Sequence, residues 1–184
     1  CIELRLDLFQ PAPADLALPV LLTPRHPDEG GDARCIDPEH RADLCRPWLP
    51  FASAIDIEID QARAMAEFLA ETRSAGLVTV LSYHDFATTP ETPALEERIR
   101  TGIERGADIV KIATRTETVA DVDRLLGVFQ SFPKQPLAIM GMGPQGKPSR
   151  LAAARLGSVL NYAAIDTPTV EGQWEASEFA QRLT

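Results

Sequence analysis

The sequence predicts an α/β protein with a parallel sheet, closed as a (β/α)8 TIM barrel. Three observations lead to this fold class. Short apolar segments typical of strands recur along the chain, amphipathic patterns typical of helices separate the later ones, and ionisable residues gather near the ends of several strands. Strands that alternate with helices form parallel sheets, and a barrel carries its functional residues at the carboxyl ends of its strands.

Seven apolar segments are the predicted strands. They are IELRLDL (2–8), PVLLT (19–23), SAIDIEI (53–59), LVTVLSY (77–83), ADIVKIA (107–113), PLAIM (136–140) and SVLNYA (158–163). No GxGxxG follows the first of them, which leaves an open dinucleotide-binding sheet without support. Because a (β/α)8 barrel needs one more strand, we expect this chain to lack the first strand and helix of the barrel at its N-terminus.

Four segments are predicted helices, because their apolar positions recur at spacings of three and four. They are 60–76, 91–107, 117–132 and 149–157. Gly76, Gly106 and Gly157 are expected to stop three of these helices. The connection 9–18 contains two prolines and leaves room for barely one helical turn, so the helix expected there is shortened or absent.

Composition narrows the class of protein. A length of 184 residues and 45% hydrophobic content suit one globular domain that spans 1–184. A net charge of −9 without clustered Lys and Arg argues against a nucleic-acid partner. No stretch reaches the roughly 18 apolar residues of a membrane span. We therefore expect no membrane partner. The three cysteines form no metal-type pair, so we expect no metal, and their odd number suits a reducing compartment, so we expect a cytoplasmic protein.

Charged residues stand inside two of the predicted strands. Glu3 and Arg5 alternate with aliphatic residues in the first, and Asp56 and Glu58 alternate with isoleucines in the third. If the apolar faces meet the helices, these charges point into the barrel. Sheet-edge strands with a solvated polar face would show the same alternation.

Three further ionisable residues favour the barrel interior. Arg25 follows the second strand, His84 closes the fourth, and Lys111 lies in the fifth. Singly, a structural histidine and a lysine that snorkels or pairs with a carboxylate would explain two of them. Together they suggest a site at the strand ends, where an uncharged lysine amine is a nucleophile toward carbonyls.

With these residues the chain resembles a known family, the type I 3-dehydroquinases, which are Schiff-base-forming 3-dehydroquinate dehydratases. The matching motifs are ELRLD (3–7), TPRHPDEGG (23–31), IDIE (55–58), SYHDFATTP (82–90), GADIVKIA (106–113), MGMGPQGKPSR (140–150), LGS (156–158) and EGQ (171–173). The resemblance implies a barrel that is often a homodimer and a hydro-lyase of the shikimate pathway. Such an enzyme converts a small-molecule substrate, 3-dehydroquinate, to 3-dehydroshikimate by syn elimination of water, without a metal or organic cofactor.

The resemblance also implies catalytic roles. Lys111 matches the lysine that forms an imine with the substrate ketone, and His84 matches the general base that takes the C2 proton and then helps the C1 hydroxyl to leave. Glu29 matches the glutamate that supports this histidine.

Nine further residues match the substrate-binding positions of the family. They are Glu3, Arg5, Arg25, Asp56, Met140, Met142, Arg150, Thr169 and Gln173. Of these, Arg150 is expected to grip the substrate carboxylate with help from Gln173, and the two methionines either line the pocket or fill the core. One departure stands out, since TVEGQ (169–173) replaces the usual Ser-Ala-Pro-Gly-Gln and brings Glu171 near the carboxylate site.

Two other functions remain open from the sequence. A Schiff-base class I aldolase on the same fold would use the same lysine to stabilise a carbanion. A noncatalytic ligand-binding remnant would keep the pocket alone, but it has no need of Lys111, His84 and Glu29 together.

Overall fold

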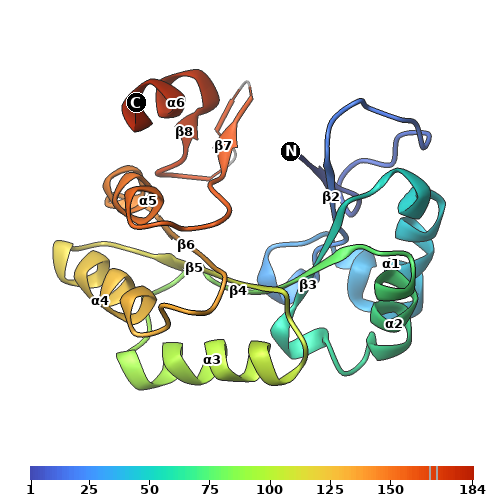
Figure 1. Cartoon of the computed structure of the whole chain (residues 1–184), viewed down its shortest axis with the longest axis horizontal. Helices are drawn as coiled ribbons and strands as arrows, with labels where there is room; N and C mark the ends of the chain where they lie inside the picture. The colour runs from blue at the N-terminus through green and yellow to red at the C-terminus, as the bar shows by residue number, and fades with distance from the viewer. Residues whose placement is uncertain (166, 169) are drawn as a thin grey trace. The chain divides into compact units, whose positions relative to one another are not determined.

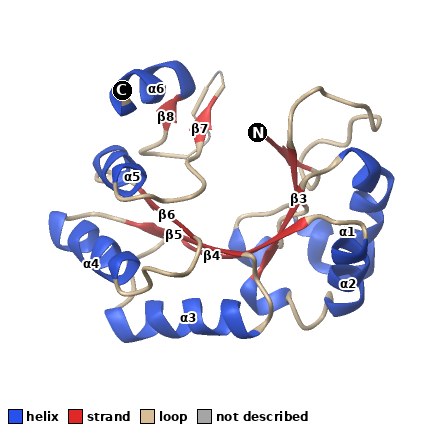
Figure 2. Ribbon diagram, in the orientation of Figure 1, coloured by secondary structure: helices blue, strands red, loops and turns tan. Residues whose placement is uncertain are grey.

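The computed structural model describes residues 1–165, 167–168 and 170–184. The chain divides into two compact units. The first contains Cys1–Tyr83 and Thr101–Asp108, and the second contains His84–Arg100 and Ile109–Thr184. Figures 1 and 2 trace the elements of both, with strands and helices alternating along the chain.

The first unit is built on parallel strands that neighbour one another in the order of the sequence. They are β1 (Ile2–Arg5), β2 (Val20–Thr23), β3 (Ala54–Glu58) and β4 (Val78–Asp85), whose last two residues belong to the second unit. Four predicted strands are therefore confirmed, with shifts at their ends. Isoleucine, valine and leucine occupy many of the buried positions, as β-branched and aliphatic residues do in parallel sheets.

The helices of the first unit differ more from the prediction. They are α1 (Pro38–Cys45) and α2 (Ala66–Ser74), with short 3-10 helices η1 (Pro27–Glu29), η2 (Ala33–Ile36), η3 (Arg46–Phe51) and η4 (Ile59–Gln61). The helix predicted from residue 60 begins only at Ala66, because η4 and a turn occupy the chain before it. The connection 9–18 contains no helix, as expected from its prolines.

Helix α1 is not among the helices that the sequence predicts. The Asp37 carboxylate accepts the backbone N–H of Glu39 at 3.0 Å, which caps the helix, and Pro38 stands at its first position. The eight residues PEHRADLC show no apolar stripe, because a buried arginine, Arg41, takes a core-facing position.

The second unit contains β5, β6 and the helices around them. Its elements are β5 (Ile109–Arg115), α4 (Val119–Gln130), β6 (Leu137–Met142), α5 (Gly146–Arg155), β7 (Ala163–Ala164), β8 (Trp174–Glu175) and α6 (Ala176–Leu183). Helix α3 (Thr92–Glu104) begins here, and its last turn belongs to the first unit. Strand β5 pairs in parallel with β6, and α4 and α5 pack on β6 (Figure 1). None of the described helices combines the length and the hydrophobicity that a membrane span requires.

The strand predicted at 158–163 is wrong in extent, because only Ala163 and Ala164 form a strand there. The Asn161 side chain donates to the carbonyl of Ser158 at 2.8 Å, and the Ser158 hydroxyl accepts the N–H of Ile139 at 3.1 Å. Polar side chains thus bond to the backbone groups that a ladder would use.

The register of β5 and β6 divides their side chains between two faces. Lys111 pairs with Ala138, and Ala113 pairs with Met140, so these residues share one face. That face continues into a cluster with Met142, against which side chains from the segments after α5 pack. The opposite face of the two strands carries aliphatic residues, Val110, Ile112, Leu137 and Ile139. The alternation therefore sets Lys111 among the apolar cluster that includes the two predicted methionines.

Candidate active site

The predicted site residues fall into two groups by unit. The first unit holds Glu3, Arg5, Arg25, Glu29 and Asp56, and the second holds His84, Lys111, Met140, Met142, Arg150 and Gln173. Thr169 lies outside the described residues. Within each unit, the structure brings several of these side chains together.

In the first unit, Arg25 lies just beyond β2 and is buried, with 3% of its surface exposed. It donates from Nη2 to Asp56 Oδ1 at 2.9 Å and from Nη1 to Glu58 Oε1 at 2.9 Å. The Ser82 hydroxyl lies 2.7 Å from Arg25 Nη1 and donates to Asp56 Oδ1 at 2.6 Å. Asp56 and Glu58 are themselves buried, so a solvated polar face is wrong for β3.

Two charges in this cluster were not predicted as site residues. Glu58 accepts from Arg25 with Oε1 and from Arg41 Nη2 with Oε2, and its Oε1 also accepts the N–H of His26 at 2.9 Å. Arg41 also donates from Nε to the carbonyl of Pro24 at 2.7 Å. The alternation in β3 was a signal for Glu58, whereas no pattern marked Arg41.

The charge state of Arg25 follows from its neighbours. Burial by itself would lower the pKa of Arg25, but the attraction of Asp56 and Glu58, with smaller contributions from Glu3 and Glu29, leaves this pKa raised above its ordinary value. Arg25 is therefore a permanent cation held in place by buried carboxylates.

A tight turn places Glu29 a few residues beyond Arg25. Residues 27–29 form η1, and the Nδ1 atom of His26 accepts the N–H of Asp28 at 3.2 Å. Gly31 is required at the end of the turn, because a Cβ atom there would lie 1.9 Å from the carbonyl oxygen of Arg25. The DEGG motif is thus explained by close backbone approach, which fixes the path of the chain on both sides of Glu29.

The charges of β1 are already engaged. Arg5 makes a two-point contact with the carboxylate of Asp7, at 2.9 and 2.7 Å, and donates to the carbonyl of Gly30 at 3.1 Å. Glu3 accepts from the Thr23 hydroxyl at 2.8 Å. Both residues remain partly exposed.

In the second unit, Lys111 is buried with 3% of its surface exposed, and its Nζ lies 4.2 Å from the centroid of the Tyr162 ring. Such a contact orients a lysine amine against an aromatic face. The burial argues against a lysine that snorkels to solvent. Tyr162 was missed as a site residue, because a lone aromatic in an apolar segment gives no signal of its contacts.

Arg150, on α5, is also a buried cation, but in the part of the chain that the structure describes it bonds, unlike Arg25, to backbone carbonyls and not to carboxylates. It donates from Nε to the carbonyl of Gly141 and from Nη1 to the carbonyl of Tyr162, both at 3.0 Å, and Nη1 lies 3.7 Å from Met140 Sδ. Burial lowers the pKa of Arg150 to about 10, opposed by its interaction with Tyr162, so it stays charged at neutral pH. Within the described part of the chain, no carboxylate forms an ion pair with Arg150.

Other arginines of this unit differ in that respect. Arg115 and Arg124 line a pocket of about 440 Å³, and both pair with acidic side chains. Arg115 also lies 3.4 Å from the carboxylate of Glu171, so the negative charge that departs from the family pattern has a cationic partner. Arg150 is therefore better suited than either to receive an anion.

The loop between β6 and α5 is tied to the segment that carries Gln173. The N–H of Gly143 donates to the carbonyl of Glu171 at 2.8 Å. Gly146 and Gly172 approach so closely that a Cβ atom on Gly146 would lie 2.7 Å from the Gly172 Cα. The glycines of this loop thus bring the segments of Arg150 and Gln173 together by direct backbone contact.

His84 stands at the end of β4, before a turn capped by Asp85. The Asp85 carboxylate accepts the N–H groups of Ala87 and Thr88, both at 2.9 Å. The His84 ring is half-buried, and its centroid lies 6.3 Å from that of Phe86 at an interplanar angle of 15°. The imidazole thus lies near the end of β4, beside the ring of Phe86.

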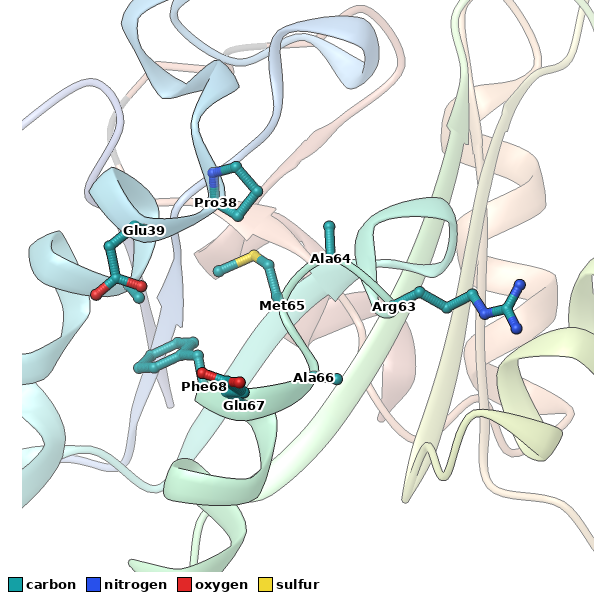
Figure 3. A pocket seen from close by; sticks show the side chains of 9 residues that line it. Pro38, Glu39, Arg63, Ala64, Met65, Ala66, Glu67 and Phe68 are labelled. Carbon is teal, nitrogen blue, oxygen red and sulfur yellow. The ribbon is translucent and has the colours of Figure 1, made fainter.

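A pocket of about 240 Å³ in the first unit contains none of the predicted site residues (Figure 3). Side chains from the start of α1 and from residues 63–68 line it, with Met65 and Phe68 buried and Glu39 and Glu67 exposed. We therefore do not place the candidate active site in this pocket.

An α/β fold of the barrel class with a buried lysine inside a strand, and with an arginine that pairs with no carboxylate among the described residues, is the arrangement expected of an enzyme that acts on anionic carbonyl compounds. Residues 1–184 match the family model described as type I 3-dehydroquinase. The chain belongs to the type I 3-dehydroquinase family.

Individual relatives agree with the family match. The 3-dehydroquinate dehydratase of Thermodesulfovibrio yellowstonii is 33% identical over 168 residues, which cover 91% of this chain and 72% of that protein. The crystal structure of the Aquifex aeolicus 3-dehydroquinate dehydratase has a TM-score of 0.80 and 31% identity, over 90% of this chain and 73% of that chain. A Clostridium difficile type I 3-dehydroquinate dehydratase with covalently modified comenic acid has a TM-score of 0.77 and 27% identity, over 90% and 67%. These matches confirm the predicted α/β barrel fold class.

Proposed function

We propose that this chain is a 3-dehydroquinate dehydratase, a hydro-lyase that forms an imine between Lys111 and its substrate. The observation that carries the proposal is the surroundings of Lys111. Its amine lies against the Tyr162 ring, on a strand face shared with Met140, while Arg150 bonds to the Tyr162 carbonyl. Lys111 and Arg150 thus both contact Tyr162. A keto acid can use both groups, because the amine can attack its ketone and the arginine can bind its carboxylate.

The chemistry of the imine accounts for the elimination. The Lys111 amine attacks the C3 ketone of 3-dehydroquinate, and loss of water gives a protonated imine. This imine withdraws electrons from the C2–H bond, so C2 can lose a proton to a modest base. The resulting enamine expels the C1 hydroxyl as water, and hydrolysis of the new imine releases 3-dehydroshikimate and restores the lysine.

We assign the proton transfers to His84, which belongs to the same unit as Lys111. An imidazole titrates near neutral pH, so it can take the C2 proton and return a proton to the departing hydroxyl. We propose that Glu29 supports His84, as its match to the family motif implies. A carboxylate in such a role favours the protonated form of the imidazole. Glu3, Arg5, Arg25, Asp56, Met142 and Gln173 are proposed to bind the substrate ring and its substituents.

Arg150 is proposed to hold the substrate carboxylate. Its Nε donates to the Gly141 carbonyl and its Nη1 to the Tyr162 carbonyl, so among the described residues Nη2 is the nitrogen left to donate to the anion. A charge-assisted hydrogen bond of this kind contributes about 1.5–3 kcal/mol.

Replacing Arg150 with methionine should therefore weaken substrate binding by about 10-fold to 150-fold. Affinity measured in an enzyme blocked at Lys111 should fall as the pH rises through about 10, because Arg150 then loses its proton and with it the attraction for the carboxylate. The Arg150→Met variant, made in the same background, should lack this alkaline fall. An equal fall in both proteins would contradict the assignment.

Turnover distinguishes the proposed function from its alternatives. The purified protein is incubated with 3-dehydroquinate, and the conjugated product is followed by its ultraviolet absorbance. The proposal predicts dehydration that needs no added metal or cofactor. Cleavage of phosphorylated sugars without dehydration would support the aldolase, and binding of 3-dehydroquinate without turnover would support the noncatalytic remnant.

The single domain, the homodimer, the cytoplasmic location and the lack of nucleic-acid and membrane partners stay predictions. Sedimentation of the purified protein tests the homodimer directly.

A further inference from the structure

Arg41 is a buried cation that the mechanism above does not use. It lies on α1 with 0% of its surface exposed, and it is among the largest fully buried side chains of the described chain. Its Nε donates to the carbonyl of Pro24 and its Nη2 to Glu58, whereas its buried Nη1 has no hydrogen-bond partner among the described residues.

Stability alone is a poor explanation for this arginine. Desolvation of two buried charges offsets most of their attraction, and an apolar residue of similar size is often as stabilising as a buried ion pair. A buried nitrogen without a hydrogen bond adds a further cost. The arginine therefore calls for a role that an apolar side chain could not fill.

That role follows from the connection of Arg41 to Arg25. Glu58 accepts from Arg41 with one carboxylate oxygen and from Arg25 with the other, so the two arginines hold the carboxylate between them. Arg41 also bonds to the carbonyl of Pro24, the residue directly before Arg25. Both the side chain that orients Arg25 and the backbone that precedes it are thus fixed by Arg41.

The balance of charge points the same way. Arg25 is surrounded by acidic groups, with Asp56 and Glu58 in direct contact and Glu3 and Glu29 close enough to affect it. Arg41 supplies the second buried positive charge of this cluster. Without it, Asp56 and Glu58 would outweigh Arg25, and the cluster would repel an anion.

We propose that Arg41 is a positioning residue for substrate binding, which acts through Glu58 on Arg25 and cancels the charge of Glu58. This inference rests on the function proposed above, because it assumes that Arg25 faces an anionic substrate. It places a determinant of affinity on a helix that contributes none of the predicted site residues.

The test compares four variants of the full chain. Arg41→Met removes the charge and keeps an unbranched side chain, and it should raise KM for 3-dehydroquinate by about tenfold with kcat within about threefold. Arg41→Lys keeps the charge and should leave KM within about threefold. The double variant R41M/E58Q removes one charge of each sign, and its KM should return most of the way to the wild-type value. Arg46→Met removes a partly exposed charge at the end of α1 and should leave both constants unchanged.

The double variant separates charge from architecture. If Arg41 only supported the fold, removal of Glu58 as well would leave KM at the R41M value or worsen it. The thermal midpoints of the same variants report the contribution of Arg41 to stability separately from its effect on KM. If R41M does not fold, R41K and the double variant still test the proposed role of Arg41. A tenfold higher KM in both of them would overturn it.

The failures of the two proposals can be told apart. If folded R41M has an unchanged KM and the wild-type protein turns over 3-dehydroquinate, only the proposed role of Arg41 is contradicted. A wild-type protein without turnover contradicts the proposed function and this inference together.

Discussion

Replacing Lys111 with methionine should lower kcat for 3-dehydroquinate by a factor on the order of 10⁴ or more, because no other group of this strand can form the imine. The substitution suits its surroundings. Lys111 is buried on the face of β5 that carries Ala113, beside Met140 of β6, so an unbranched apolar side chain fits there. We therefore expect a thermal midpoint equal to or above that of the wild-type protein, which would separate lost chemistry from lost folding. Steady-state kinetics and a thermal melt provide the two measurements.

Lys134→Met is the matched control for this variant. Lys134 is exposed and lies between α4 and β6, so its loss removes the same charge from the same unit without touching the candidate site. Its kcat should equal that of the wild-type protein. Retention of more than about a hundredth of wild-type kcat by Lys111→Met would contradict the assigned nucleophile.

Replacing His84 with asparagine should lower kcat by about 10²-fold to 10⁴-fold, the range that a general acid and base contributes. Asparagine keeps a polar side chain of similar reach at the end of β4 but cannot exchange a proton near neutral pH. Exchange of the C2 proton of 3-dehydroquinate with deuterated solvent, followed by NMR, should be lost together with turnover. This readout reports the proton-transfer step itself and not the stability of the fold.

The exposed residue His40, on α1, offers the control for this variant. His40→Asn should retain both turnover and C2 exchange. If His84→Asn kept C2 exchange at the wild-type rate, another group would be the base, and the stacked ring beside Phe86 would be a structural histidine after all.

Much of the fold could be predicted because local pattern and tertiary environment agree. Residues 109–113 of β5 are apolar apart from Lys111, and the alternation of a strand then assigns Lys111 and Ala113 to one face. The same rule placed Asp56 on one face of β3, where the carboxylate is buried and pairs with Arg25. Period-two alternation determines which residues share a face, and that was sufficient here.

The rest depends on contacts between segments that are distant in sequence. Arg41 is buried because Glu58 and the Pro24 carbonyl accept its hydrogen bonds, and nothing within PEHRADLC reveals those partners. Tyr162 belongs to the site through its ring contact with Lys111 and its carbonyl bond to Arg150, neither of which leaves a pattern in the sequence. A single sequence records the residues and their spacing, whereas pairing across the fold is a tertiary property.

Reductive trapping tests whether Lys111 forms an imine with 3-dehydroquinate. The protein is incubated with 3-dehydroquinate and borohydride, which reduces an imine to a stable secondary amine, and mass spectrometry then locates the added mass. We expect one adduct per chain, on the peptide that contains Lys111, with loss of activity in proportion to labelling and no adduct in Lys111→Met. An adduct on Lys134 or Lys147 instead, or full activity with no adduct, would contradict it.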